Sequence, residues 1–250
     1  MVETKALITA TLDAGLEFFR APHGELSEAQ KAGVLVERRA RPPVLVPIRS
    51  LAESHRERIA QHLLALDGQD RYLRFGYAAQ EAQIRAYTDK LDFERDEIYG
   101  IYNRKLELIA MAHLAFASNA ECKSCAEFGC SVLKGVRGRG YGARLFDRAV
   151  MHARNEGVDL MFIHALSENT AMLNIARKAG ALVERDGSES EAYLKLTEAT
   201  IDSRVTEMVE TQMAEVDFQL KLQAKRFWEF LADVQSIREG VRLGRHKSAE

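Results

Sequence analysis

The pattern of apolar and polar positions predicts alternating strands and helices through the middle of the chain. Apolar residues at every second position, or in a short run, indicate a strand, and apolar residues three and four apart indicate one face of a helix. We expect strands near residues 44–48, 97–103, 106–117, 126–133, 160–166, 181–185 and 191–196. We expect helices near residues 51–65, 79–91, 143–153 and 167–180. Residues 70–76, which mix charged and aromatic side chains, are interpreted as a turn.

The C-terminal part has a different pattern, with neither proline nor glycine between about Ala199 and Gly240. Its apolar positions predict one long amphipathic helix, or two: Val205, Met208, Val209, Met213, Val216, Leu220, Phe227, Phe230, Leu231, Val234 and Ile237. Two interpretations of this apolar stripe remain open. It packs against its own domain, or it forms the seam of a homodimer, because the spacing is close to the roughly 3.5-residue repeat of coiled coils.

Residues 133–142 (Leu-Lys-Gly-Val-Arg-Gly-Arg-Gly-Tyr-Gly) carry the clearest chemical signal. Glycines let successive backbone N–H groups converge, and the helix that follows adds free donors and a positive dipole end. Arg137 and Arg139 add positive charge, so the segment predicts a cradle for a phosphate or pyrophosphate. It lacks the Gly-Lys-Ser/Thr of a Walker loop and the spacing of a dinucleotide fingerprint. A glycine-rich turn without a ligand is the alternative.

A second motif follows the predicted strand 160–166. Ser167 is a candidate N-cap and Gly180 a candidate C′ residue for the short helix between them. With both motifs in this order, residues 44–197 resemble the GNAT acetyltransferase superfamily. Its acyl-CoA loop pattern is matched by Arg137, Gly140 and Gly142, and its later asparagine motif by Asn169, Met172, Ile175, Lys178 and Gly180.

The resemblance implies an α/β (α+β) fold, with a mixed, mostly antiparallel sheet flanked by helices. It implies acetyl-CoA as co-substrate, an amine as acceptor and no metal. The residues expected to bind acetyl-CoA are Val132, Leu133, Arg137, Gly138, Arg139, Gly140, Tyr141, Gly142 and Asn169. Its pantetheine arm should lie against the strand before the loop, where a backbone N–H near residues 130–133 would polarise the thioester carbonyl.

Glu127 is the candidate catalytic base, because an attacking amine is protonated at neutral pH and must lose its proton. It is the one carboxylate within the apolar strand 126–133, and an outward-facing strand glutamate is the alternative. His113 and His164 are weaker candidates, because a histidine in an apolar strand is more often a hydrogen-bonded core residue. The position where many family members carry a tyrosine general acid is Ala176, which cannot donate a proton.

Composition restricts the class of protein further. The chain has 250 residues, 46% of them hydrophobic and 29% charged, with a net charge of −2. This charge predicts no general attraction to nucleic acid or to a membrane surface, and no apolar run approaches the roughly 18 residues of a membrane span. We therefore expect a soluble, cytoplasmic protein. Cys122, Cys125 and Cys130 are interpreted as reduced thiols, because zinc usually needs about four ligands and no second pair lies nearby.

The expected organisation has three parts. Residues 1–43 form a weakly ordered extension, residues 44–198 the acyl-CoA-binding domain, and residues 199–250 a helical extension with a basic tail. The predicted function is N-acetyl transfer by direct attack in a ternary complex. Residues 70–76 resemble the protein-acetylating branch of the family, which favours a protein lysine as acceptor. The alternatives are a non-catalytic acyl-CoA-binding regulatory module and a helix-mediated assembly protein.

Overall fold

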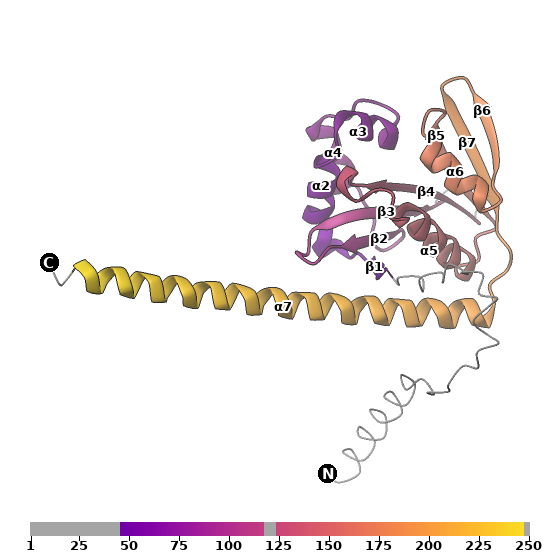
Figure 1. Ribbon diagram of the computed structural model, residues 1–250. Coiled ribbons are helices and arrows are strands. Elements are labelled where there is room, and N and C mark those ends of the chain that lie inside the picture. Colours follow the sequence, from indigo (N-terminus) through magenta and orange to yellow (C-terminus); the bar gives the residue numbers. More distant parts are fainter. Residues whose placement is uncertain (1–45, 118–123, 248–250) are drawn as a thin grey trace, which may run out of the picture. The chain divides into compact units, whose positions relative to one another are not determined.

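The computed structural model describes residues 46–117 and 124–247, in which one sheet has helices on both faces (Figure 1). The strands are β1 (Arg49–Ser50), β2 (Glu97–Tyr102), β3 (Leu108–Phe116), β4 (Cys125–Val132), β5 (Leu160–Leu166), β6 (Leu182–Asp186) and β7 (Glu189–Lys195). The helices are α2 (Arg56–Leu64), α3 (Gly68–Phe75), α4 (Glu81–Asp89), α5 (Tyr141–Asn155), α6 (Thr170–Lys178) and α7 (Ile201–Lys247), with short 3-10 turns η2 (Glu53–His55) and η3 (Lys134–Val136). The expected extension at residues 1–43 lies outside the described residues.

The sheet has the strand order β1-β2-β3-β4-β5-β7-β6, and every neighbouring pair is antiparallel except β4 and β5. The predicted mixed, mostly antiparallel sheet flanked by helices is therefore confirmed. The parallel pair is also the short one: it joins only Cys125 to Leu160, Ala126 to Met161 and Glu127 to Phe162. Beyond these residues the two strands separate, and this separation creates the site described below.

Each face of the sheet covers its own apolar core. One core combines Tyr99 and Phe128 of the sheet with Leu145 and Phe146 of α5. The other combines Ile98 and Tyr102 of β2 with Ile59 and Leu63 of α2 and Phe218 of α7. Neighbouring residues of β2 enter different cores because successive side chains of a strand point to opposite faces. The sheet is therefore held between two helical layers.

His62 links α2 to the sheet from within the second core. Its side chain is buried, with Nδ1 2.8 Å from the carbonyl oxygen of Leu108 and Nε2 2.9 Å from Ser131 Oγ. Burial lowers the pKa of His62 to about 4, although both hydrogen bonds oppose this shift. The neutral imidazole thus connects α2 with β3 and β4, and it fixes Ser131 next to the glycine loop.

Two expectations about local structure are wrong. Residues 46–48 are not in a strand, and the edge strand β1 is only Arg49–Ser50. Residues 70–76 are not a turn, because α3 (Gly68–Phe75) occupies this segment. The side chain of Asp67 caps its start by accepting from Asp70 N at 2.9 Å, and Gly76, with φ +79°, ends it in the left-handed conformation.

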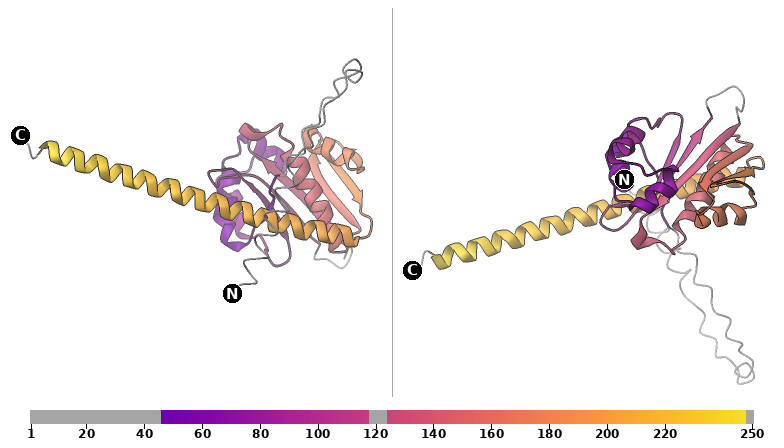
Figure 2. Two further views of the ribbon diagram at one scale, coloured as in Figure 1. Left: turned by 60° about the horizontal axis from the view of Figure 1, so that its bottom comes forward. Right: turned by 90° about the horizontal axis from the view of Figure 1, so that it is seen from above.

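The C-terminal segment is one continuous helix of 47 residues, α7, which packs against β1 and α5 and then continues beyond them (Figure 2). The buried Arg148 of α5 donates to Thr211 Oγ1 at 2.7 Å and pairs with Glu207 and Glu210, both at 3.4 Å. Phe218 of α7 is buried in the second core, with the Arg49 guanidinium 3.9 Å from its ring centre. Among the described residues, no helix combines the length and apolar character needed to span a membrane.

Candidate active site

Two cavities meet where β4 and β5 separate. The loop cavity, about 390 Å³, is enclosed by α3, the end of β4, the glycine loop and the starts of α5 and α6. The splay cavity, about 370 Å³, is enclosed by the end of α3, the middle of β4, β5 and the start of β7. Both cavities are lined by Leu73, Arg74, Cys130, Asn169 and Met172. These five residues form a shared wall, so ligands in the two cavities would meet there.

The loop cavity contains most of the residues expected to bind acetyl-CoA. Its lining includes Val132, Arg137, Gly138, Gly140, Tyr141, Gly142 and Asn169. Leu133 lies instead beside a separate cavity next to α2 and α7, and Arg139 is exposed without lining the loop cavity. The structure thus brings seven of the nine expected residues together.

The backbone of the loop is shaped by two glycines in the left-handed conformation, Gly138 with φ +77° and Gly140 with φ +79°. A side chain would be strained at both positions, because residues with a Cβ rarely adopt this conformation. A Cβ built at either position would meet no atom within 4 Å, so both Cα atoms face open space. Gly140 also caps the start of α5, where free N–H groups gather. These features fit a bound diphosphate.

The Arg137 guanidinium is paired within the protein and does not stand alone at the rim of the loop. Its Nη2 lies 2.6 Å from the buried carboxylate of Asp70, and its Nε donates to the carbonyl oxygen of Val132 at 3.1 Å. A neighbouring exposed pair, Lys134 and Asp67, is separated by 3.4 Å. Arg137 therefore fastens the loop to α3 and to the end of β4. The role of Asp70 was not predicted, because its segment was interpreted as a turn.

Asn169 joins the asparagine motif to α3. Its side-chain oxygen accepts from Met172 N at 3.2 Å, so Asn169 is the N-cap of α6. The expected cap, Ser167, is instead bonded to Ser190 Oγ at 2.8 Å. The Asn169 amide nitrogen lies 3.5 Å from the carbonyl oxygen of Leu73. Gly180, with φ +90°, has the left-handed conformation expected of a C′ residue.

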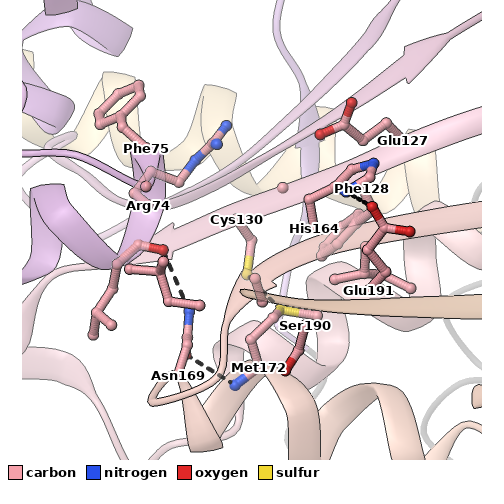
Figure 3. Close-up of a pocket in the computed structure, with 16 residues that line it drawn as sticks. Arg74, Phe75, Glu127, Phe128, Cys130, His164, Asn169, Met172, Ser190 and Glu191 are labelled. Carbon is pink, nitrogen blue, oxygen red and sulfur yellow. Dashed lines mark hydrogen bonds and ion pairs between the residues drawn. The ribbon is translucent and has the colours of Figure 1, made fainter. Parts of the chain in front are cut away.

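The splay cavity carries charged side chains on its outer side (Figure 3). Glu127 lies on β4, where it is exposed and faces Ala115 of β3 across the ladder. His164 of β5 lies across the strand separation, with Nδ1 3.4 Å from Glu191 Oε1 of β7. Both partners are about half exposed (49% and 48%). The structure therefore places Glu127 and His164 on the same cavity, with a second carboxylate beside them.

Arg74, at the end of α3, reaches the wall between the two cavities. A Cβ at Gly129 would lie 2.9 Å from the Arg74 guanidinium carbon, so the glycine allows the side chain to lie directly against β4. Arg74 Nη2 donates to Tyr87 Oη at 3.0 Å. Arg74 Nε is buried and has no hydrogen-bond partner among the described residues. A glycine inside a strand often marks such a close approach, and Gly129 was the available sequence signal for it.

A series of hydrogen bonds through Tyr87, His113 and Asp96 supports the Arg74 side chain. Tyr87 Oη is 2.9 Å from His113 Nδ1, and His113 Nε2 is 3.0 Å from Asp96 Oδ2. Since a carboxylate only accepts, Nε2 carries the His113 proton and Nδ1 accepts from Tyr87. Burial lowers the pKa of His113, with Asp96 opposing and Arg74 adding to the shift. Neutral His113 is therefore a structural link to Arg74 and does not line either cavity.

The series of hydrogen bonds from Arg74 ends at Asp96, whose pKa lies below its ordinary value. Burial raises that pKa, but hydrogen bonds from Arg95 and His113 outweigh burial and hold it below its ordinary value. Arg95 Nε donates to Asp96 Oδ1 at 2.7 Å. Tyr87, Asp96 and Arg95 were not predicted, because they come from α4 and the connection after it rather than from either motif.

Two further residues limit the chemistry of the site. Ala176 is buried on α6, so the usual tyrosine position offers no acid. Cys130 is a free cysteine on the shared wall, and burial raises its pKa to about 11. The expectation of reduced thiols is wrong for Cys125, which is disulfide-bonded, and Cys122 lies outside the described residues. Within the described ranges, no three His, Cys, Asp or Glu side chains are placed to hold a metal ion.

Comparison with known proteins assigns this domain. Residues 62–181 match the model of the acetyltransferase (GNAT) family. The GNAT domain of S. lividans PAT has a similar fold, with 19% identity and a TM-score of 0.51 over 60% of this chain and 89% of that chain. The acetyltransferase of the GNAT family from Streptococcus pneumoniae is also similar, with 10% identity and a TM-score of 0.50 over 60% and 98%. No curated protein matches the sequence. Residues 62–181 therefore belong to a domain of the GNAT family, and the protein is an acyltransferase.

Proposed function

We propose that the protein transfers an acetyl group from acetyl-CoA directly to the side-chain amine of a protein lysine. The shared wall between the loop cavity and the splay cavity carries this proposal, because it provides two separate binding spaces with one meeting point. Holding two reactants together in this way is a large part of catalysis for an already activated donor.

The loop cavity fits the donor, for which Gly138, Gly140 and Tyr141 provide the opening and Asn169 and Val132 the inner walls. Acetyl-CoA supplies an activated thioester, so the chain mainly has to bind it, orient it and exclude water. Beyond Glu127, β4 stays paired with β3 but has no strand partner on the β5 side, so this edge could align the pantetheine arm. A backbone N–H near residues 130–133 would then donate to the carbonyl oxygen.

The splay cavity suits a cationic acceptor. Glu127 and Glu191 place two exposed carboxylates at this cavity, which favour the approach of an ammonium group. Glu127 would then take the proton that the amine must lose before it attacks. A covalent route through Cys130 is disfavoured, because a thiol with a pKa of about 11 stays protonated at neutral pH. These observations support direct transfer in a ternary complex.

The test uses the full chain, acetyl-CoA and a panel of lysine peptides and small amines. Released CoA is measured with a thiol reagent, and the acetylated product is identified by mass spectrometry. We expect CoA release that depends on a lysine peptide and a product carrying one added acetyl group. Turnover with small amines and none with any peptide would reject the lysine acceptor and leave amine acetylation in place.

We also propose that the enzyme is a homodimer through α7. The helix exposes large apolar side chains that its own domain does not cover, including Val216, Leu220 and Phe227. A contiguous apolar surface of this kind usually marks a contact with another molecule.

A further inference from the structure

The face of α7 that contacts its own domain is distinct from the face that is exposed. Toward the domain it presents Glu207, Thr211, Ala214 and Phe218, which pair with Arg148 or are buried. These residues follow one another at intervals of four, three and four, so they occupy one stripe along the helix.

A second stripe has the same periodicity and is apolar. Its described members are Val209, Met213, Val216, Leu220, Phe227 and Phe230, all between 46% and 61% exposed. At about 100° per residue, this stripe lies on the side of the helix opposite Glu207, Thr211 and Phe218. The domain therefore leaves most of it uncovered, although Met213 also lines a cavity together with residues 46–48. The two interpretations left open by the sequence describe two different faces of one helix.

The stripe follows a strict seven-residue repeat. In heptad notation, Met213, Leu220 and Phe227 occupy a positions, and Val209, Val216 and Phe230 occupy d positions. Gln223 is the polar exception at a d position. In the sequence the same repeat continues through Val234, Ile237 and Val241. A repeat of roughly 3.5 residues that is sustained over this length, with one polar exception, is the pattern of a coiled coil.

We infer that a second copy of α7 covers this stripe, as a parallel, in-register, two-stranded coiled coil. The inference rests on the proposed homodimer and specifies its geometry. The stripe is flanked by Glu210, Gln212, Asp217 and Gln219, so its apolar width suits one partner helix. β-Branched residues at d positions favour coiled coils of more than two helices. Such coils would bury the polar flanking residues, so the flanks favour two helices. Each domain lies on the side of its helix away from the seam, which leaves the seam accessible.

Polar and charged positions select the parallel orientation. In parallel register Gln223 faces Gln223 of the other copy, and the two amides can bond to each other. The antiparallel register with the greatest overlap instead places Gln223 against Phe227 and brings the two Arg226 residues together. Both comparisons favour the parallel coil.

The first experiment measures oligomeric state by sedimentation equilibrium of the full chain. We expect a dimer, and we expect Leu220→Asp to weaken dimerisation by at least roughly 100-fold, because it buries two carboxylates in the seam. Met208→Asp is the matched control, since Met208 is 68% exposed on the same helix but lies outside the repeat. A wild-type monomer at all concentrations would reject the homodimer and this inference together. A trimer or tetramer, or equal weakening by both variants, would reject the two-stranded seam.

The second experiment tests orientation with Gln223→Cys under mild oxidation. A parallel in-register coil brings the two introduced thiols together, so we expect a covalent dimer beyond any seen in the wild type. Glu229→Cys, at an exposed position outside the seam, is the control and should not cross-link. A sedimenting dimer in which Gln223→Cys fails to cross-link would overturn the parallel arrangement and leave the homodimer intact. Acetyl-CoA binding by Leu220→Asp, checked by calorimetry, confirms that the domain is still folded.

Discussion

The two cavities of the site are built in different ways. The loop cavity includes a nearly continuous run of residues from the glycine loop and the start of α5, and the backbone of Gly138 and Gly140 shapes this part of it. The splay cavity takes its charged lining from side chains on separate elements: Arg74 on α3, Glu127 on β4 and His164 on β5. A cavity made of backbone can bind the same ligand in many sequences, whereas a cavity made of side chains can change its ligand by substitution. Under the proposed function, the loop cavity would bind the donor and the splay cavity the acceptor, so substitutions of side chains would change the acceptor more readily than the donor.

This contrast predicts that substitutions in the splay cavity affect turnover and leave donor affinity unchanged. The largest effect is expected for Glu127→Gln, which removes the base without changing the size of the side chain. Turnover at neutral pH should fall roughly 100-fold, and the deficit should shrink as pH rises and free amine accumulates. Initial rates and acetyl-CoA calorimetry measure the two properties separately. Glu198→Gln, at an exposed glutamate far along the chain, is the control, and equal rates in both variants would remove Glu127 from the mechanism.

The buried His62, which is bonded to Ser131 of the loop cavity, predicts a pH effect on stability. The folded pKa of His62 is about 4, below the ordinary 6.5, so the unfolded chain binds a proton first as pH falls. His62 therefore stabilises the fold fully above pH 6.5, and this contribution is lost as pH falls toward 4. At about pH 5 the loss should be about 2 kcal/mol.

Urea unfolding at about pH 5 and at neutral pH measures this loss. His62→Gln should lower stability at neutral pH, because the bonds to Leu108 and Ser131 change, but it should remove most of the pH dependence. A variant that keeps the wild-type pH dependence would show that other groups cause it.

The glycine loop predicts a change in donor affinity instead of turnover. Gly140→Val places a branched side chain at φ +79° and beside open cavity space, so it is both strained and obstructive. Acetyl-CoA should bind at least roughly tenfold more weakly, about 1.4 kcal/mol. Gly135→Val is the matched control, because Gly135 has neither a positive φ nor a place in the cavity lining. Unchanged binding by Gly140→Val would place the donor elsewhere.

The smallest effect is expected for Tyr87→Phe, which removes the hydroxyl between Arg74 and His113. Arg74 would lose its support at the shared wall, and kcat/KM for the acceptor should fall roughly fivefold, as for one lost hydrogen bond. Donor affinity should not change. Tyr77→Phe removes a hydroxyl from a largely exposed tyrosine next to the same helix and is the control. If both variants lower kcat/KM equally, the hydrogen-bond chain does not position Arg74.

The same difference in construction explains what could be predicted from the sequence. Most strands and the glycine loop follow from local signals, since alternation marks strands and the glycines lie together in one segment. The order of the strands in the sheet does not, because it depends on which strands pair after folding. Glu127 could be identified from the sequence because it is the one carboxylate in an otherwise apolar strand. Arg74, Tyr87 and Asp96 could not, because they are neighbours only after α3, α4 and the sheet pack together.

α3 shows why one element was missed altogether. α3 has only eight residues, which is too short a segment for a helical period to stand out in the sequence. Its Asp70 is buried against a charged partner, Arg137, more than sixty positions away. The N-cap Asp67 and the terminal Gly76 were the available signals. Likewise, the apolar positions of α7 predicted an amphipathic helix that packs on its own domain or forms a seam, and only the contacts of Glu207 and Phe218 show which face the domain covers.

The separation of β4 from β5 has a consequence for the behaviour of the protein in concentrated solution. From Phe128 to Val132, β4 has no strand partner on one side, so the middle of the sheet contains an edge. Sheet edges of this kind can recruit a strand from another molecule and start aggregation, and charged groups placed over an edge oppose this. The Arg74 guanidinium lies against Gly129 in the middle of this stretch. Arg74, which lines both cavities, thus places a charge over this edge. Acetyl-CoA bound along β4, as proposed, would cover the rest of it.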